Sequence, residues 1–239
     1  MQISDERRLE LEDVRCDVCG SDEYDVVWRA VLPASVQPTM FSYTGGKRFH
    51  GRLVRCRNCG LRYVSPRPRL TRELYSAVED PHYEATRQGR LRAFSKLLPI
   101  ISEFAPAGAS LLDLGCATGP LLEVARSAGY RTRGVEPSRW ASAVASSAGL
   151  AVDNCTFEEF RTEERFDIVT CLDVLEHVDS PLRVARLARG LLKPGGHLVI
   201  SVPDFSLWHT KLLRRFHWLV VLLHYYYHML LLDVVTPGY

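Results

Sequence analysis

The sequence lacks a strong excess of charge of either sign: 30 Lys and Arg face 28 Asp and Glu, and the formal net charge is +2. A chain this balanced has no overall electrostatic attraction for nucleic acid or for an anionic membrane. The opening residues, MQISDERRLELED, also lack the apolar core of a secretion signal. Long hydrophobic runs are missing too, because the uncharged run 216–232 is shorter than the roughly 20 apolar residues that cross a bilayer.

Cysteine is unevenly placed in the sequence. Of the seven cysteines, four form two Cys-x-x-Cys pairs, and Cys116, Cys155 and Cys171 stand alone. This pattern differs from the cysteine framework of a small secreted domain. It favours a reducing compartment, so we expect a cytoplasmic protein whose paired cysteines bind a metal ion.

The two pairs are Cys16-Asp-Val-Cys19-Gly20 and Cys56-Arg-Asn-Cys59-Gly60. Each turn brings two thiolates together, and the following glycine lets backbone N–H groups approach the sulfurs. Four thiolates make a closed tetrahedral site, so we predict a structural Zn²⁺ held by Cys16, Cys19, Cys56 and Cys59. The alternative is a redox dithiol or a set of unpaired thiols. We assign residues 1–69 to this zinc-ribbon module, with β-like segments at 24–31 and 53–56 and a Gly45-Gly46 turn between them.

A helical segment is expected to connect this module to the rest of the chain. Residues 63–69 contain two prolines and predict an extended exit, after which a helical pattern runs from 70 to 104 with a break at Pro81. The apolar residues that recur at helical spacing predict packing on the next domain, and they are Leu91, Phe94, Leu97, Leu98 and Ile101. We assign 70–108 to this connecting segment.

Predicted strands and helices alternate from 109 to 205. The expected strands are a short one that begins at Ser110 and runs into a glycine-rich turn ending at Gly119, then 130–135, 150–152, 166–172 and 197–202. The expected helices are 120–128, 138–147, a short one that a capping box starts at Thr156, and one that starts at Ser180-Pro181 and ends before Pro194. Such alternation is typical of an α/β fold, a Rossmann-like parallel sheet with helices on both faces.

Acidic and glycine residues gather where these strands end. The ligand of such a sheet lies at the carboxyl ends of its strands, which here carry Asp113, Gly115, Glu136, Asp153 and Asp173. A carboxylate at position 136 can accept both hydroxyls of a ribose. An acid two residues before the first glycine disfavours a pyrophosphate in the turn and favours a cationic amino-acid group.

Three blocks of sequence resemble the class I S-adenosylmethionine-dependent methyltransferases, above all the group with the ubiquinone-type O-methyltransferases. The blocks are Leu111-Leu-Asp-Leu-Gly-Cys-Ala-Thr-Gly119, Gly134-Val-Glu-Pro-Ser138, and Phe166-Asp-Ile-Val-Thr-Cys-Leu-Asp-Val-Leu-Glu-His-Val178 with Leu192-Lys-Pro-Gly-Gly-His-Leu198. Together they cover about 110 to 203. The paired cysteines followed by Leu61-Arg-Tyr-Val-Ser-Pro-Arg-Pro68 also resemble a subgroup with an N-terminal zinc ribbon that acts on sugars or natural products.

The resemblance implies roles for matching positions. Asp113, Gly115 and Gly119 would hold the methionine and ribose parts of S-adenosylmethionine, and Glu136 would bind the ribose hydroxyls. Phe157 falls in the adenine-contacting region, and Asp173 would face the methionine end and the acceptor. Ala117 stands in the cofactor turn where the family usually has glycine. His177 is a candidate general base, and no other catalytic residue is assigned. The alternatives are a cap for Asp113 or Asp173 and a surface acid for Glu136.

The last residues do not fit the family pattern. After the fifth strand the family continues with a helix and two strands, whereas this chain ends 36 residues after Pro203, so we expect those strands to be missing. Residues 206–239 predict an apolar helical tail. We expect it to pack as a core helix, and peripheral membrane contact by an interfacial helix is the alternative.

The resemblance implies O- or C-methylation of a small-molecule or sugar-type acceptor. One alternative is an RNA methyltransferase that binds through the arginine-rich ribbon, and another is a truncated, non-catalytic relic. Against nucleic acid as a partner, Leu172-Asp-Val-Leu stands where base-amino methyltransferases usually carry Asn/Asp-Pro-Pro-aromatic. The sequence indicates neither the acceptor nor the oligomeric state.

Overall fold

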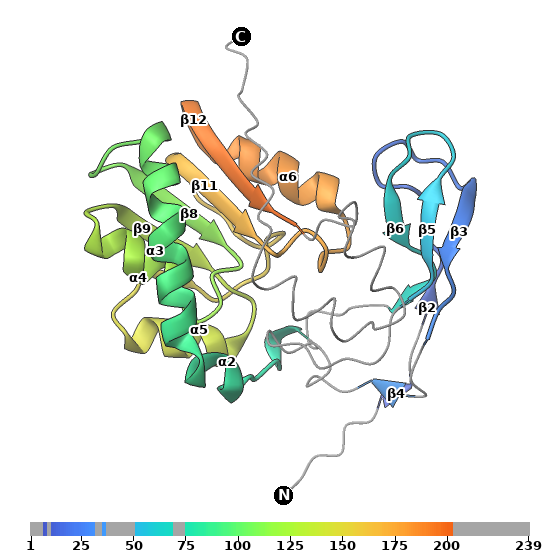
Figure 1. Ribbon diagram of the computed structural model, residues 1–239, viewed down its shortest axis with the longest axis horizontal. Coiled ribbons are helices and arrows are strands. Elements are labelled where there is room, and N and C mark those ends of the chain that lie inside the picture. Colours follow the sequence, from blue (N-terminus) through green and yellow to red (C-terminus); the bar gives the residue numbers. More distant parts are fainter. Residues whose placement is uncertain (1–6, 9–10, 32–34, 37–50, 69–74, 203–239) are drawn as a thin grey trace, which may run out of the picture.

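The computed structural model describes residues 7–8, 11–31, 35–36, 51–68 and 75–202. Within these ranges the chain forms a small antiparallel sheet beside a larger parallel sheet that helices cover on both faces (Figure 1). The predicted Gly45-Gly46 turn and the predicted tail 206–239 lie outside the described residues.

The large sheet has five parallel strands in the order β10-β9-β8-β11-β12. Their bounds are Ser110–Leu114 for β8, Arg131–Val135 for β9, Val152–Asp153 for β10, Phe166–Leu172 for β11 and Leu192–Ser201 for β12. Strands β9 and β10 follow β8 on one side of the sheet, and the chain then crosses over so that β11 pairs with the other side of β8. The strand order reverses at this point, and a parallel sheet binds its ligand at such a reversal, here at the carboxyl ends of β8 and β11. The predicted fold class is confirmed.

Helices cover both faces because alternate strand residues point to opposite sides. On one face α3 (Arg87–Phe104), α4 (Pro120–Ser127) and α5 (Arg139–Ser147) share a buried cluster with Leu111 of β8. On the other face α6 (Pro181–Gly190) packs with the neighbouring residues Leu112 and Leu114. Leu97 and Ile101 of α3 are buried, with Phe94 and Leu98 against them, which confirms the predicted packing of this helix. None of the described helices has both the length and the apolar character needed to cross a membrane.

The predicted break at Pro81 is present, because the helical residues 75–76 are followed by non-helical residues at 77–80. Pro81 lies at the end of this break and begins α2 (Pro81–Ala85), since proline has no N–H to lose at a first helical position. Asp80 caps α2 by accepting the backbone N–H of Tyr83 at 2.9 Å. The predicted helix at Thr156 was wrong: the capping box forms only one turn, although the Thr156 N–H does donate to Glu159 at 3.0 Å. The polar and largely exposed residues that follow offer no apolar face to continue a helix.

Strand β12 is longer than its predicted span. It starts at Leu192 and takes up the Pro194-Gly195-Gly196 segment, which was expected to be a turn before the strand. The extra residues cause an irregularity in the pairing with β11, between Phe166 and Ile168.

The small sheet has three antiparallel strands in the order β3-β5-β6, with bounds Tyr24–Trp28, Leu53–Cys56 and Arg62–Val64. Two short ladders accompany it, β2 (Leu11–Glu12) with β7 (Arg67–Pro68) and β1 (Arg7–Arg8) with β4 (Ser35–Val36). The expected extended connection at 63–69 is therefore largely taken up by β6 and β7. Pairing of Tyr24 with Cys56 brings the second cysteine turn beside the chain that leaves the first.

Candidate functional site

The four paired cysteines come together at one end of the small sheet. Their sulfur atoms all lie within 4.8 Å of one another. The Sγ atoms of Cys16 and Cys59 are 3.4 Å apart, and those of Cys19 and Cys56 are 3.5 Å apart. A tetrahedral zinc ion with Zn–S bonds of about 2.3 Å places its sulfurs about 3.8 Å apart. The donor set and its spacing therefore fit Zn²⁺.

Backbone hydrogen bonds fix the two cysteine turns. The Gly20 N–H donates to the Cys16 carbonyl at 2.8 Å, and the Gly60 N–H donates to the Cys56 carbonyl at 3.0 Å. The backbone N–H of Ser21 and the side chain of Asn58 lower the pKa of Cys19 to about 6. A thiolate is the form of cysteine that binds a metal ion, so the low pKa of Cys19 suits a metal ligand. Hydrogen bonds among the four clustered sulfurs raise the pKa of Cys59 to about 12.

The glycine-rich turn follows the central strand β8. Gly115 and Gly119 both have φ near +80°, and each is also tightly packed. A Cβ on Gly115 would lie 2.5 Å from Val174 Cγ2, and one on Gly119 would lie 2.3 Å from Leu150 Cδ1. Ala117 has φ of 47°, a left-handed conformation that alanine adopts only with strain. A positive φ favours glycine, which is the residue that the family resemblance leads us to expect at this position.

Glu136 lies beside this turn, at the carboxyl end of β9. Its side chain is buried, with 2% exposure, so it is not a surface acid. One carboxylate oxygen accepts the backbone N–H of Ala117 at 2.9 Å, and the other accepts the N–H of Ser138 at 2.8 Å. The carboxylate is thus held in one orientation against the turn. Its predicted role in binding ribose hydroxyls requires this placement.

Asp113 lies on the neighbouring strand and is almost fully buried. Its Oδ1 accepts the hydroxyl of Thr170 at 2.6 Å, so it caps no helix through this atom. Burial raises the pKa of Asp113 to about 7; the Thr170 hydrogen bond lowers it, and the charge of Glu136 raises it. A bound cation would stabilise the ionised form of this buried carboxyl, because a nearby positive charge lowers the pKa of a carboxyl group.

This pKa predicts a pH dependence of cofactor binding. A cation bound beside Asp113 favours the carboxylate, so binding below pH 7 must release a proton, and affinity falls as pH falls. Between pH 7.5 and pH 6 we expect the dissociation constant for S-adenosylmethionine to rise roughly five- to tenfold. Calorimetry in buffers of different ionisation enthalpy measures both the constant and the proton released. Asp113→Asn should remove the pH dependence, and a constant affinity in the wild type would contradict this assignment.

The remaining predicted residues are placed differently from one another. Phe157 is buried against the turn, with its Cζ 3.7 Å from the position of a Gly115 Cβ. Asp173 ends β11 in a left-handed conformation, and its carboxylate accepts the Ser201 hydroxyl at 2.9 Å. Asp153 does not join this group, because both of its carboxylate oxygens bind Arg133, at 2.7 and 3.1 Å. His177 lies farther along, in a turn.

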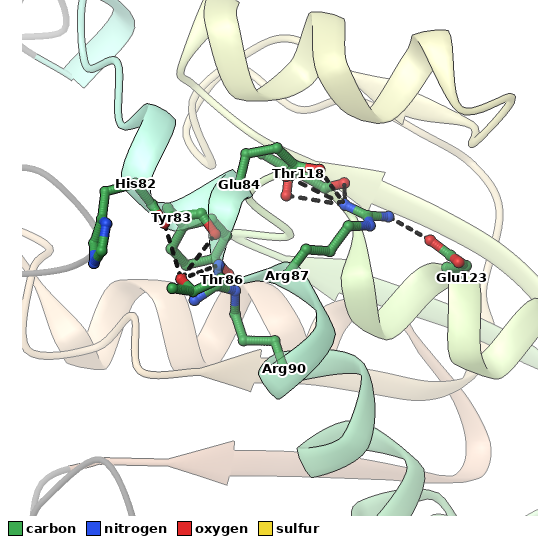
Figure 2. Close-up of polar contacts among 8 residues, drawn as sticks. All are labelled: His82, Tyr83, Glu84, Thr86, Arg87, Arg90, Thr118 and Glu123. Carbon is green, nitrogen blue, oxygen red and sulfur yellow. Dashed lines mark hydrogen bonds and ion pairs between the residues drawn. The ribbon is translucent and has the colours of Figure 1, made fainter.

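Arg87, the first residue of α3, holds the glycine-rich turn from outside and has no sequence motif that reveals it. Its Nη1 donates to the carbonyl and the hydroxyl of Thr118, at 3.1 and 3.2 Å. The same guanidinium pairs with Glu123 of α4 and with Glu84 of α2. Figure 2 shows Arg87 reaching toward Thr118 and Glu123, while Arg90 of the same helix lies beside Tyr83. Arg87 therefore connects the glycine-rich turn with α2 and α4 beside the predicted cofactor site.

Loss of this guanidinium is expected to loosen the turn. We expect Arg87→Gln to weaken S-adenosylmethionine binding about tenfold, because the energy of one charge-assisted hydrogen bond corresponds to about that factor. Arg90→Gln is the matched control: Arg90 lies on the same helix, with its guanidinium carbon 3.4 Å from the Tyr83 ring centre. Calorimetry measures the affinity of each variant for S-adenosylmethionine, and thermal unfolding measures its stability. Equal affinity losses in both would mean that Arg87 acts only through the stability of α3.

Comparisons with known proteins agree with this arrangement. Residues 83–230 match a family described as a methyltransferase domain. The ubiquinone biosynthesis O-methyltransferase of Ralstonia nicotianae is 41% identical over 106 residues, which cover 40% of this chain and 43% of that protein. The protein of the same name from Actinobacillus pleuropneumoniae serotype 7 is 36% identical over 112 residues, which cover 42% and 48%. The chain thus spans less than half the length of these curated relatives.

Similar solved structures include an amino pentose methyltransferase from Micromonospora echinaspora with bound S-adenosylmethionine. It has a TM-score of 0.47 and 26% identity, and the match covers 54% of this chain and 59% of that one. A sugar N-methyltransferase from a Streptoalloteichus species has a TM-score of 0.45 and 26% identity, and the match covers 51% and 52%.

Proposed function

Since this chain belongs to the class I S-adenosylmethionine-dependent methyltransferases, we propose that it transfers a methyl group to a small-molecule or sugar-type acceptor at oxygen or carbon. The observation that carries the proposal is the buried carboxylate of Glu136, held by the backbone of Ala117 and Ser138 beside a left-handed turn. A fixed acceptor of hydroxyl groups at this edge of the sheet suits a nucleoside. The three sequence blocks and the similarity to O-methyltransferases support the same activity.

The chain's own residues would act mainly by binding and alignment. S-adenosylmethionine supplies an activated methyl carbon, so the protein needs to orient the acceptor and, for a hydroxyl, to remove its proton. Asp113 would attract the cationic end of the cofactor, Glu136 would orient its ribose, and the ring of Phe157 would lie along its adenine. Asp173 would border the reacting end, and His177 is the candidate base for an acceptor hydroxyl.

A structural Zn²⁺ bound by the four cysteines completes the proposal. The closed set of four sulfurs leaves no position for a substrate, so the ion would stabilise the fold of the small sheet rather than react. Residues 1–69 would then form the zinc-ribbon module, 70–108 the connecting helical segment and 109–205 the cofactor-binding domain.

Release of S-adenosylhomocysteine tests the class of acceptor. The metal-loaded protein is incubated with S-adenosylmethionine and, separately, with a set of phenols, a set of nucleotide-linked sugars, and total RNA. We expect product only with a member of the first two sets. Product that depends on RNA and falls steeply with added salt would instead support the nucleic-acid alternative, because phosphate contacts are salt-sensitive.

A further inference from the structure

The first cysteine turn also caps a helix of the large domain. Asp17 lies between Cys16 and Cys19, and its Oδ2 accepts the backbone N–H of Leu182 at 2.7 Å. Its Oδ1 accepts the hydroxyl of Ser180 at 2.7 Å, and Ser180 is itself the N-cap of α6. The first N–H groups of a helix lack partners within it and carry partial positive charge, so a carboxylate from outside stabilises them. Figure 1 shows the small sheet standing on the side of the large domain where α6 lies.

Two more contacts join the N-terminal part of the chain to the residues just before α6. Arg67 donates to the carbonyl of Asp179 at 2.5 Å, and its guanidinium lies 3.5 Å from the carboxylate of the same residue. Glu12 holds Arg67 in place at 2.9 Å, and the Arg67 side chain is only 22% exposed. The Tyr75 hydroxyl donates to the carbonyl of His177.

The other end of this segment lies at the predicted cofactor site. Asp173 is fixed to Ser201 by its backbone N–H, at 3.0 Å from the hydroxyl, as well as by its carboxylate. Val174 fills the space over Gly115, where a Cβ would come within 2.5 Å of it. Residues 173–182 therefore run from the glycine-rich turn to the part of the chain that carries the four cysteines, residues 1–69, which we call the cysteine module. Hydrogen bonds hold this segment at both ends.

We propose that Asp17 and Arg67 are positioning residues through which the cysteine module holds the segment 173–182 and so shapes the acceptor side of the site. The proposal rests on the proposed function, since Asp173, at the start of the segment, would border the reacting end. Glu136 and Ala117, by contrast, are fixed by bonds within the large domain. Loss of Asp17 should therefore change acceptor use while affinity for S-adenosylmethionine stays the same.

The test compares Asp17→Ala with Asp22→Ala in the zinc-loaded protein. Asp22 is an exposed acid of the same module that pairs with Arg15 at 4.0 Å, so its loss leaves the contacts to α6 in place. Hydrogen exchange of a peptide covering Leu182 and Arg183 reports the cap directly and requires no substrate. We expect exchange about tenfold faster in Asp17→Ala, the usual size of a lost helix cap, with wild-type exchange in Asp22→Ala. With an acceptor, KM should rise in Asp17→Ala only.

Arg67→Gln provides a second variant whose mutated residue is not within a cysteine turn, in case Asp17→Ala loses its zinc. We expect it to speed exchange at residues 178–182 with the zinc content unchanged. Unchanged exchange in both variants, with zinc retained, would overturn the proposal. Failure of the wild type to bind S-adenosylmethionine would overturn the proposed function instead, and the exchange result would still decide whether the module holds the segment.

Discussion

Replacement of Glu136 by glutamine is expected to weaken the binding of S-adenosylmethionine about 30-fold. The carboxylate is buried at the end of β9, and each of its oxygens already accepts one backbone N–H. Carboxylate oxygens have further lone pairs, so both ribose hydroxyls can donate to them. Charge-assisted hydrogen bonds are worth about 1.5–3 kcal/mol, roughly twice neutral ones, so a neutral acceptor loses about 2 kcal/mol over two bonds. Calorimetric titration of the zinc-loaded protein measures this loss.

The same variant has a separate effect on folding. An amide NH₂ would face the N–H of Ala117 or Ser138, so we expect the free energy of unfolding to fall by about 1–3 kcal/mol. Asp153→Asn is the matched control, because Asp153 ends the next strand but binds Arg133 instead. It should lower stability without changing affinity. A folded Glu136→Gln protein with wild-type affinity would contradict the assignment, and no binding by folded wild type would favour the non-catalytic relic.

The parts of the fold that local pattern determines were predictable from the sequence. Strand β11 was predicted to the residue, because the apolar run 166–172 is bounded by polar segments. The start of α6 followed from Ser180 as N-cap and Pro181 as first residue. The break at Pro81 was also predicted, but not that Pro81 begins the next helix, because proline breaks a helix in its interior and is tolerated at its first position. The capping box at Thr156 formed its hydrogen bond, but a cap cannot extend a helix that has no apolar face to bury.

The candidate site was predictable only where its residues follow a strand directly. Asp113, Gly115 and Glu136 lie at the ends of β8 and β9, and the topology of a parallel sheet brings such ends together. Their partners could not be found in this way. Thr170, Arg87 and Asp17 make their contacts with residues far along the chain, and each looks in the sequence like an ordinary strand, surface or turn residue. Packing of the elements creates these contacts, and no local spacing encodes them.

Loss of the metal ion is expected to unfold the small sheet while the large domain stays folded. Among the described residues of the module, 11–31 and 51–68, the buried apolar side chains are Val54 and the two cysteines Cys16 and Cys56. Val18, Val26 and Val31 are each more than half exposed. A core this small cannot offset the entropy of ordering its chain, so the ion must supply much of the folding energy. Structural zinc contributes about 10–16 kcal/mol in isolated zinc-finger peptides, far more than a few apolar contacts.

Cys16→Ser removes one of the four predicted ligands and is the sharpest test of the site. We expect the wild type to contain one zinc ion per chain and the variant to lose it, with fast hydrogen exchange throughout β3, β5 and β6. Exchange in β8 and β11 should stay slow, because their core lies within the large domain. Cys155→Ser is the control, since Cys155 lies outside the cluster of four sulfurs. A wild type that contains no metal, or a Cys16→Ser protein that keeps both its zinc and its slow exchange, would rule out a structural zinc site. The first of these results would favour the redox dithiol, whose thiols would react with a disulfide reagent in the folded protein.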